Sequence, residues 1–267
     1  MGKYDPKQWK DIYDRYLRLE EELIERPKPL FRFGKSYLGV STISEQGYCE
    51  KKVEFESQIG KQETEDMRSG TEAHELLLRD SVSVPLSDAW EGIFTKELTV
   101  LREFYVAAKV NDYPIIGKID ALVFYRSSPV LLFEHKFSSS PYPWESYHIQ
   151  ARTYCYVLNR MGFDTSRLTY AIVVAPLAAR DDPLLMDSVN LVAKNLHKST
   201  LDIPLTEGVG KAYLHRYQQA IAESHLIELL DYWLEKRQAR GSDSAGKCKA
   251  CEFRKNCELS LYPGRHL

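Results

Sequence analysis

The fold is decided by two apolar runs joined by a short turn, which read Ile115-Ile-Gly-Lys-Ile-Asp-Ala-Leu-Val-Phe-Tyr125, Arg126-Ser-Ser-Pro129 and Val130-Leu-Leu-Phe-Glu-His-Lys-Phe137. Both runs predict buried strands, and the turn is short enough to join them as a hairpin. Side chains alternate along a strand, so Glu134 and Lys136 share one face. In one register Asp120 faces Glu134, and in a neighbouring register it faces Lys136, so either register brings the three charged side chains together.

Charged side chains inside apolar strands are costly unless they are paired with each other or bind a metal ion. One interpretation is therefore a buried salt-bridge triad that holds the sheet together. The other is a site for metal-assisted hydrolysis of a phosphodiester. In that site Asp120 and Glu134 hold a hard divalent cation, and Lys136 orients the attacking water or neutralises the charge that develops on the phosphate.

Three motifs stand in order along the chain: Gly70-Thr-Glu-Ala-His74-Glu75, then Gly117-Lys-Ile-Asp120 with Glu134-His-Lys136, then Gln150-Ala-Arg-Thr-Tyr154. Taken singly, a histidine is more often a satisfied core or surface residue, and Gln150 and Tyr154 fit simple packing on one helical face. Together, the order and spacing resemble the RecB-like branch of the PD-(D/E)xK nuclease superfamily. The resemblance implies an α/β, restriction-endonuclease-like fold, in which helices flank a central mixed sheet.

The same resemblance implies a role for each motif residue. His74, Asp120 and Glu134 would hold Mg²⁺ or Mn²⁺, and the backbone carbonyl of His135 is a further candidate ligand. Lys136 would serve the attacking water and the transition state, while Gln150 and Tyr154 would orient the lysine or the substrate. An imidazole ligand favours Mn²⁺ over Mg²⁺.

Five cysteines are present, and three of them, Cys248, Cys251 and Cys257, lie within ten residues. Cys49 is the fourth candidate ligand, whereas Cys155 lies on an apolar helix stripe and predicts a core residue. A three-plus-one split disfavours a zinc ribbon, which draws its ligands as two nearby pairs, and a disulfide is disfavoured in a reducing compartment. The split resembles that of RecB-like iron–sulfur nucleases, in which a four-iron four-sulfur (4Fe–4S) cluster joins the N- and C-terminal segments.

Basic residues surround these cysteines. Residues 236–255 carry seven basic and two acidic side chains, although the net charge of the whole chain is −2. A cluster that joined the two ends would gather a set of cations that could guide a DNA strand: Lys51, Lys52, Lys247, Lys249, Arg254 and Lys255. The alternative is a solvated helix end and tail.

Residue patterns predict one domain over 1–267, made of an N-terminal helical extension (1–35), a nuclease core (36–240) and a C-terminal cysteine segment (241–267). Apolar periodicity and caps predict elements over much of the chain and leave 182–205 ambiguous. The predicted helices are 6–25, one that begins near the capping box Thr42-Ile-Ser-Glu45 and carries Cys49, 63–79, 144–160 and 209–239; strands are predicted within 92–137 and over 168–175.

Composition narrows the class of protein. Hydrophobic residues make up 43% of the chain and charged residues 28%, which excludes a disordered chain. We find no apolar run long enough to span a membrane and no signal peptide, so a cytoplasmic protein is expected. The chain has no P-loop, so no ATP-driven motor is expected.

These observations predict a hydrolase: a divalent-metal-dependent DNA exonuclease that acts on single-stranded DNA or frayed ends. Two relatives compete. One is the CRISPR-associated RecB-like exonuclease, which trims DNA before spacer integration and would have an integrase complex as partner; the other is the stand-alone exonuclease V. Rivals from other classes are a non-catalytic, zinc-containing DNA-binding protein and a structural subunit of a helicase–nuclease or integration complex. The sequence leaves cleavage polarity and oligomeric state open.

Overall fold

Seven strands form the mixed sheet on which the rest of the described chain packs. The computed structural model describes residues 6–25, 27–61, 68–69, 72, 83–180, 182, 185, 187–194, 202–206 and 209–262. The strands of this part of the chain are β1 (Leu38–Gly39), β2 (Leu98–Val110), β3 (Tyr113–Tyr125), β4 (Ser128–Phe137), β5 (Thr169–Ala175), β6 (Asp202–Thr206) and β7 (Gly210–Arg216).

Strand β3 is the hub of the sheet, because it pairs with three other strands. It is antiparallel to β2 along one edge, while its other edge is shared by β1, which is parallel, and β4, which is antiparallel. Strand β4 continues into a parallel pair with β5, and the antiparallel strands β7 and β6 complete the order.

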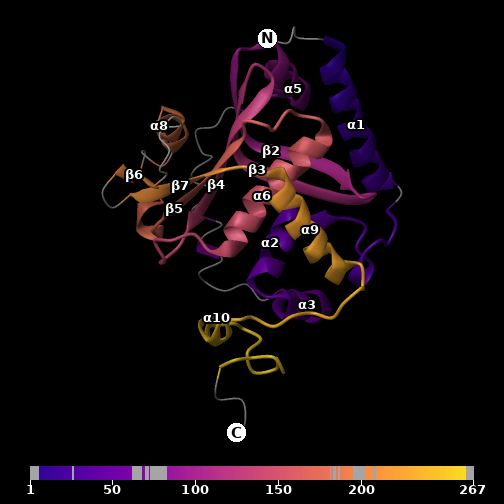
Figure 1. Cartoon of the computed structure of the whole chain (residues 1–267), viewed down its shortest axis with the longest axis vertical. Coiled ribbons are helices and arrows are strands. Elements are labelled where there is room, and N and C mark those ends of the chain that lie inside the picture. The colour runs from indigo at the N-terminus through magenta and orange to yellow at the C-terminus, as the bar shows by residue number, and fades with distance from the viewer. Residues whose placement is uncertain are drawn as a thin grey trace.

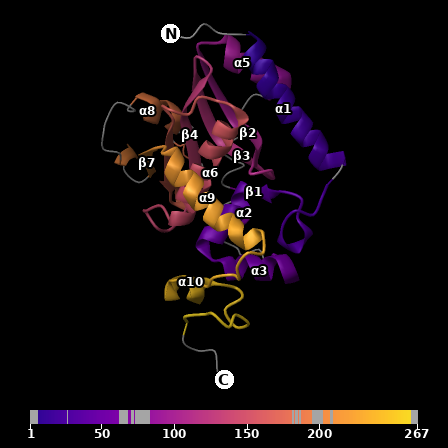
Figure 2. The same cartoon turned by 45° about the vertical axis from the view of Figure 1, so that its right-hand side comes forward.

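Helices cover the two faces of the sheet unequally. Helices α2, α6 and α9 lie on one face, as both views show, and α8 lies on the other (Figures 1 and 2). The helices are α1 (Pro6–Glu25), α2 (Val40–Tyr48), α3 (Glu50–Ile59), α5 (Leu86–Thr95), α6 (Glu145–Met161), α8 (Ser188–Lys194), α9 (Gln219–Trp233) and α10 (Ala245–Ala250), with short 3-10 turns at Arg32–Gly34 and Leu177–Ala179.

The β3–β4 hairpin fixes the position of the charged side chains. Ala121 pairs with Phe133 and Leu122 with Leu132, so the same register continued by one residue places Asp120 beside Glu134. The connection is a two-residue turn whose residues Arg126 and Ser127 have φ angles of 49° and 67°. Consecutive residues with positive φ are typical of the tight turns that match strand twist. The first of the two predicted registers is thus confirmed.

Several predicted elements are confirmed by the structure. The helix over 6–25 is α1, the helix over 144–160 is α6, and the strand over 168–175 is β5. The run of strands begins at Leu98 rather than at 92, because residues 92–95 are the last turn of α5. Most of the predicted helix over 63–79 lies outside the described residues.

Two predictions about helices need correction. The helix predicted to begin near Thr42 is α2, but it begins at Val40 directly after β1, with Gly39 as its N-cap in place of the capping box, and Cys49 is its C-cap. The long helix predicted over 209–239 is instead strand β7 followed by the shorter helix α9. Residues 210–216 are drawn into the sheet because they pair with both β5 and β6.

Among the described helices, each is too short or too polar to cross a lipid bilayer.

Two neighbouring histidines, His148 on α6 and His215 on β7, make the stability of the fold depend on pH. Burial, and next the neighbouring His215, lower the pKa of His148 to about 4, whereas an unfolded chain would titrate near its ordinary value of 6.5. The rings of His148 and His215 are 4.7 Å apart. As the pH falls from 6.5 to about 4, His148 of the unfolded chain binds a proton that His148 of the folded chain does not. The stability that the neutral histidine contributes is therefore fully present above pH 6.5 and is lost as the pH falls to about 4.

We therefore expect His148→Gln to lose less stability than the wild type when the pH falls from about 7.5 to about 5. Urea unfolding at both pH values measures this difference. Equal losses in the two proteins would show that His148 does not carry the pH dependence.

Candidate active site and cysteine pocket

Asp120, Glu134 and Lys136 come together where β3 and β4 run side by side. The Oδ2 atom of Asp120 accepts a hydrogen bond of 2.7 Å from the backbone N–H of His135. Lys136 Nζ lies 2.7 Å from Glu134 Oε1, and Glu134 is only 1% exposed. The hairpin therefore presents two carboxylates and an ammonium at one place.

Helix α6 adds Gln150 and Tyr154 to this group. Lys136 Nζ donates to Gln150 Oε1 at 3.0 Å, and Gln150 Nε2 donates to the hydroxyl of Tyr154 at 3.4 Å. That hydroxyl in turn donates to the carbonyl of Lys118 on β3 at 2.8 Å. A chain of hydrogen bonds thus runs from the lysine through one face of α6 and back to the sheet.

The tyrosine fits against the sheet because residue 117 is a glycine. A Cβ atom at Gly117 would lie 2.5 Å from Tyr154 Cε1 and 2.9 Å from Val40 Cγ2. Both distances are shorter than real contacts, so a side chain there would move the tyrosine ring or helix α2. This close approach explains the first residue of the Gly117-Lys-Ile-Asp120 motif.

The electrostatics of the site favour a charged lysine and a neutral tyrosine. Burial on its own lowers the pKa of Lys136, but the negative charges of Glu134 and Asp120 outweigh burial, and the pKa is raised. Burial, followed by the charge of Glu134, raises the pKa of Tyr154 well above its ordinary value. The lysine is therefore an ammonium that can face developing negative charge, and the tyrosine is a hydrogen-bond donor.

Three contacts of the site were not predicted from the sequence. The ring of His135 reaches away from α6: its Nε2 atom is 3.1 Å from Ser188 Oγ on α8, and its Nδ1 atom is 3.7 Å from Asp120 Oδ2. On the other side, Lys136 Nζ lies 5.2 Å from the ring centre of Tyr147. Tyr147 precedes Gln150 by one helical turn, a spacing that could have indicated it, whereas no local signal points to Ser188.

The predicted ligand His74 lies outside the described residues. Within the part of the chain that the structure describes, no group of three or more histidine, cysteine, aspartate or glutamate side chains is arranged around a single metal ion. The donor chemistry nevertheless fits a hard divalent cation, because Asp120 and Glu134 offer carboxylate oxygens at a partly buried position.

The other candidate site is a pocket lined by four of the five cysteines. Cys49 lies at the junction of α2 and α3, and it is both the last cap of one helix and the first cap of the other. The other three lie in and after α10, which packs below α3 in both views (Figures 1 and 2): Cys248, Cys251 and Cys257. As predicted, Cys155 is elsewhere, fully buried in the core on α6.

Backbone N–H groups point to sulfur in this pocket. Burial raises the pKa of Cys49, while the N–H groups of Lys51 and Lys52, in the first turn of α3, lower it. Burial likewise raises the pKa of Cys251, and the N–H of Phe253 lowers it. Leu261 N donates to Cys248 Sγ at 3.4 Å. Such donors favour thiolates, the form in which cysteine binds metals, but burial outweighs them here, and the pKa of both Cys49 and Cys251 is raised.

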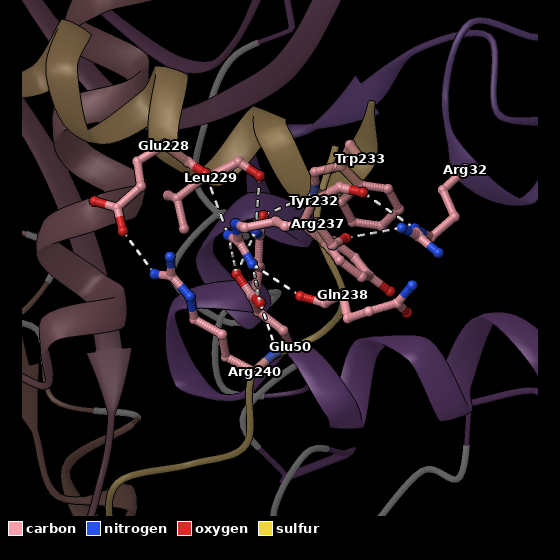
Figure 3. A network of polar contacts seen from close by, with 10 residues as sticks. Arg32, Glu50, Glu228, Leu229, Tyr232, Trp233, Arg237, Gln238 and Arg240 are labelled. Atoms are coloured by element: carbon pink, nitrogen blue, oxygen red, sulfur yellow. Dashed lines mark hydrogen bonds and ion pairs between the residues drawn. The ribbon is translucent and has the colours of Figure 1, made fainter. Parts of the chain in front are cut away.

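A partly buried ion pair ties the start of α3 to the segment after α9, beside this pocket (Figure 3). Arg237, after α9, donates from both terminal nitrogens to the two carboxylate oxygens of Glu50 at 2.5 Å, and the backbone N–H of Arg240 donates to the same carboxylate at 2.8 Å. These donors lower the pKa of Glu50 although burial opposes them. Glu50 follows Cys49 directly, so the pair fixes the cysteine relative to the segment that leads to α10.

The basic residues predicted to contact DNA fall into two groups. Lys51 Nζ lies 2.7 Å from Glu258 Oε1, Lys52 Nζ lies 3.0 Å from Glu252 Oε1, and Lys247 Nζ donates to the carbonyl of Tyr48 at 3.4 Å. These three are engaged within the protein. The other three have exposed side chains on the C-terminal segment: Lys249, Arg254 and Lys255.

Comparison with known proteins identifies the family. Residues 51–258 match the model of the PD-(D/E)XK nuclease superfamily. The curated protein "Exonuclease V" of Danio rerio is 24% identical over 283 aligned positions, which cover 86% of this chain and 72% of that protein.

Two solved structures match the chain at low identity. SSO0001 is 15% identical, with 96% of this chain and 98% of that chain covered and a TM-score of 0.46. A protein from Eubacterium rectale is 11% identical, with 85% of this chain and 90% of that chain covered, also at a TM-score of 0.46.

The family model spans most of the chain and contains the acid–lysine hairpin and the Gln150–Tyr154 helix. The chain therefore belongs to the PD-(D/E)XK nuclease superfamily and is a nuclease, a hydrolase of phosphodiester bonds.

Proposed function

We propose that this nuclease is a divalent-metal-dependent DNA exonuclease that acts on single-stranded DNA or frayed ends. The observation that carries the proposal is the junction of Asp120, Glu134 and Lys136, in which the lysine is held by Glu134 and Gln150. A salt-bridge triad that only stabilised the sheet would not need the further connection through Gln150 and Tyr154. The name of the Danio rerio relative supports exonuclease activity.

Asp120 and Glu134 would hold Mg²⁺ or Mn²⁺, with His74 and the backbone carbonyl of His135 as further proposed ligands. When bound, such an ion polarises the scissile phosphate and acidifies a water molecule. The hydrogen bond from His135 N fixes the Asp120 carboxylate, so that one oxygen is held in place by the backbone. An imidazole ligand would favour Mn²⁺.

The remaining residues act by position and charge. The Lys136 ammonium faces the place where the carboxylates meet, so it can orient a water molecule and offset negative charge on the phosphate. Gln150 restricts Lys136 by accepting its hydrogen bond, and Tyr154 restricts Gln150. Because the group is largely buried, these interactions are stronger than they would be in water.

The cysteine pocket would hold a structural 4Fe–4S cluster. All four thiols line one cavity. Zinc ribbons draw their ligands as two nearby pairs, whereas here one cysteine lies far upstream of the other three. This three-plus-one split supports the cluster over the zinc that a non-catalytic DNA-binding protein would carry.

The predicted DNA contacts near the cluster are best supported for the exposed cations, Lys249, Arg254 and Lys255. Lys51, Lys52 and Lys247 would contribute less, because they are half-buried and ion pairs or backbone contacts engage them. Arg254 also donates to the carbonyl of Lys249 at 2.7 Å, but its side chain is exposed.

The pathway remains a matter of prediction. The curated relative favours a stand-alone enzyme of the exonuclease V type. Prespacer trimming beside a CRISPR integrase, a structural role in a larger complex, the cytoplasmic location and the three-part division of the domain stay predictions. Genes for an integrase beside this gene would favour the CRISPR role.

Removal of the acids or the lysine should abolish cleavage. We expect Asp120→Asn, Glu134→Gln and Lys136→Met each to lower the rate at least about 100-fold, because each removes a charge that the transition state needs. End-labelled single strands with Mg²⁺, Mn²⁺ or chelator measure the rate. Glu91→Ala and Lys96→Ala, which change exposed residues on and after α5, serve as matched controls. Cleavage that survives in all three site variants would refute the site.

Tyr154→Phe tests the positioning role of the tyrosine. The change removes the hydroxyl that holds Gln150 and keeps the ring that packs on Gly117. We expect kcat to fall about tenfold with little change in KM, since the ring is kept and the lost hydroxyl is bonded to Gln150 and to the carbonyl of Lys118. An equal fall in kcat and rise in KM would assign Tyr154 to substrate binding instead.

The cluster can be tested with the five cysteines of the chain. Replacement of any of the four pocket cysteines by serine should remove the visible absorbance and bound iron of protein purified without oxygen. Cys155→Ala is the matched control and should leave both unchanged, because Cys155 is in the core on α6. Stoichiometric zinc with no iron in the wild type would overturn the cluster proposal.

A further inference from the structure

A second hollow borders the active site on the side of α1. It has a volume of about 550 Å³ and lies between α1, the β1–α2 connection and the adjoining parts of β2 and β3. Gly117, Lys118 and Tyr154 form its inner wall. Tyr154 is also the last member of the hydrogen-bond chain that begins at Lys136, so the hollow and the active site share a wall.

Exposed aromatic and aliphatic side chains line the outer part of this hollow, which we name the α1 groove. Tyr105 on β2 is 56% exposed, Tyr37 before β1 is 43% exposed, and Ile24 on α1 is 73% exposed. Single exposed apolar side chains are ordinary, but a group of them around one hollow marks a binding surface.

The charges of the α1 groove do not match a row of phosphates. Among the described residues that line it, Lys118 is the one cation and Glu20 the one acid. The Lys118 ammonium already pairs with Glu103 and lies 5.9 Å from the ring centre of Tyr105. A wall of this kind suits a flat, uncharged and partly apolar ligand better than a phosphate backbone.

Unpaired nucleobases have this chemistry. Bases of a single strand stack on aromatic side chains with little regard to sequence, whereas the bases of a duplex are already stacked inside it. The shared wall at Tyr154 would let a strand lie in the groove while its end reaches the carboxylates.

We propose that the α1 groove binds the unpaired bases of the DNA strand that enters the active site, with Tyr105 and Tyr37 as stacking platforms and α1 as the outer wall. This inference rests on the proposed function, because it takes DNA as the substrate. It gives the N-terminal helix a role in selecting single-stranded ends, since Tyr16, Glu20, Leu23 and Ile24 of α1 close one side of the groove.

Alanine at each platform tests the proposal. Tyr105→Ala and Tyr37→Ala should each raise the Kd for a fluorescent oligothymidylate at least about fivefold, while Tyr→Phe at either position keeps the affinity. Anisotropy is measured in chelator, so that the strand is not cut. The slope of log Kd against log salt should stay unchanged, because no phosphate contact is removed. Tyr125→Ala is the matched control, a tyrosine of 43% exposure at the far end of β3.

Photocrosslinking locates the strand independently of affinity. An oligonucleotide that carries 5-iodouracil should crosslink to the peptides that contain Tyr105 or Tyr37. Wild-type affinity in both alanine variants, or crosslinks confined to other peptides, would overturn the groove. So would a change from dimer to monomer in Tyr105→Ala without loss of DNA affinity, since the groove would then be an interface between copies of the chain.

These outcomes separate the groove from the proposed function. Metal-dependent cleavage by the wild type together with unaffected alanine variants removes the groove and leaves the nuclease proposal standing. A wild type that binds oligothymidylate through Tyr105 but never cuts DNA removes the proposed DNA cleavage and leaves the groove standing.

Discussion

The register of the β3–β4 hairpin is the constraint on which the rest of the site depends. Because side chains alternate along a strand, a slip of one residue would carry the charged side chains to opposite faces of the sheet. The pairing of Ala121 with Phe133 prevents this, since both side chains are buried on the face that α8 covers. The tight turn at Arg126 and Ser127 pairs Tyr125 with Ser128, and a shift of one residue between Val123 and Phe124 leads from there to the register of Ala121 and Phe133. Asp120, Glu134 and Lys136 therefore meet as a consequence of apolar packing, and not because the charges attract one another.

The second requirement is that α6 lie close to the sheet. Gly117 permits this by leaving room for the ring of Tyr154, and Gly47 of α2 does the same on the other side, where a Cβ would lie 2.2 Å from Ile149 Cδ1. Two glycines on neighbouring elements thus set the distance at which Gln150 can reach Lys136. The junction of α2 and α3 is secured separately to the segment after α9 by the Glu50–Arg237 pair.

The sequence predicted those parts of the molecule in which local pattern and tertiary packing agree. The hairpin, helix α6 and the separation of Cys155 from the other four cysteines follow from alternation, helical spacing and cysteine spacing. Strand β7 was misread as helix because both of its faces are buried, Tyr213 in one core and Ala212 and Leu214 in the other, and such a strand lacks alternation. Residues 92–95 were misread as strand, since Ile93 and Phe94 favour strands, but the aromatic packing of Trp90 against Tyr13 keeps α5 helical. The contact between Ser188 on α8 and His135 could not be predicted from local sequence, because only the tertiary fold brings the two residues together.

The proposed mechanism requires that the junction of Asp120 and Glu134 bind a cation and be more than a salt bridge that stabilises the sheet. A crystal of the protein soaked in Mn²⁺ and measured at the manganese absorption edge tests this requirement. We expect an anomalous peak between the two carboxylates, with Lys136 still bonded to Gln150. An empty junction at saturating Mn²⁺, in a crystal whose lattice leaves the site open, would show that the acids serve the sheet alone.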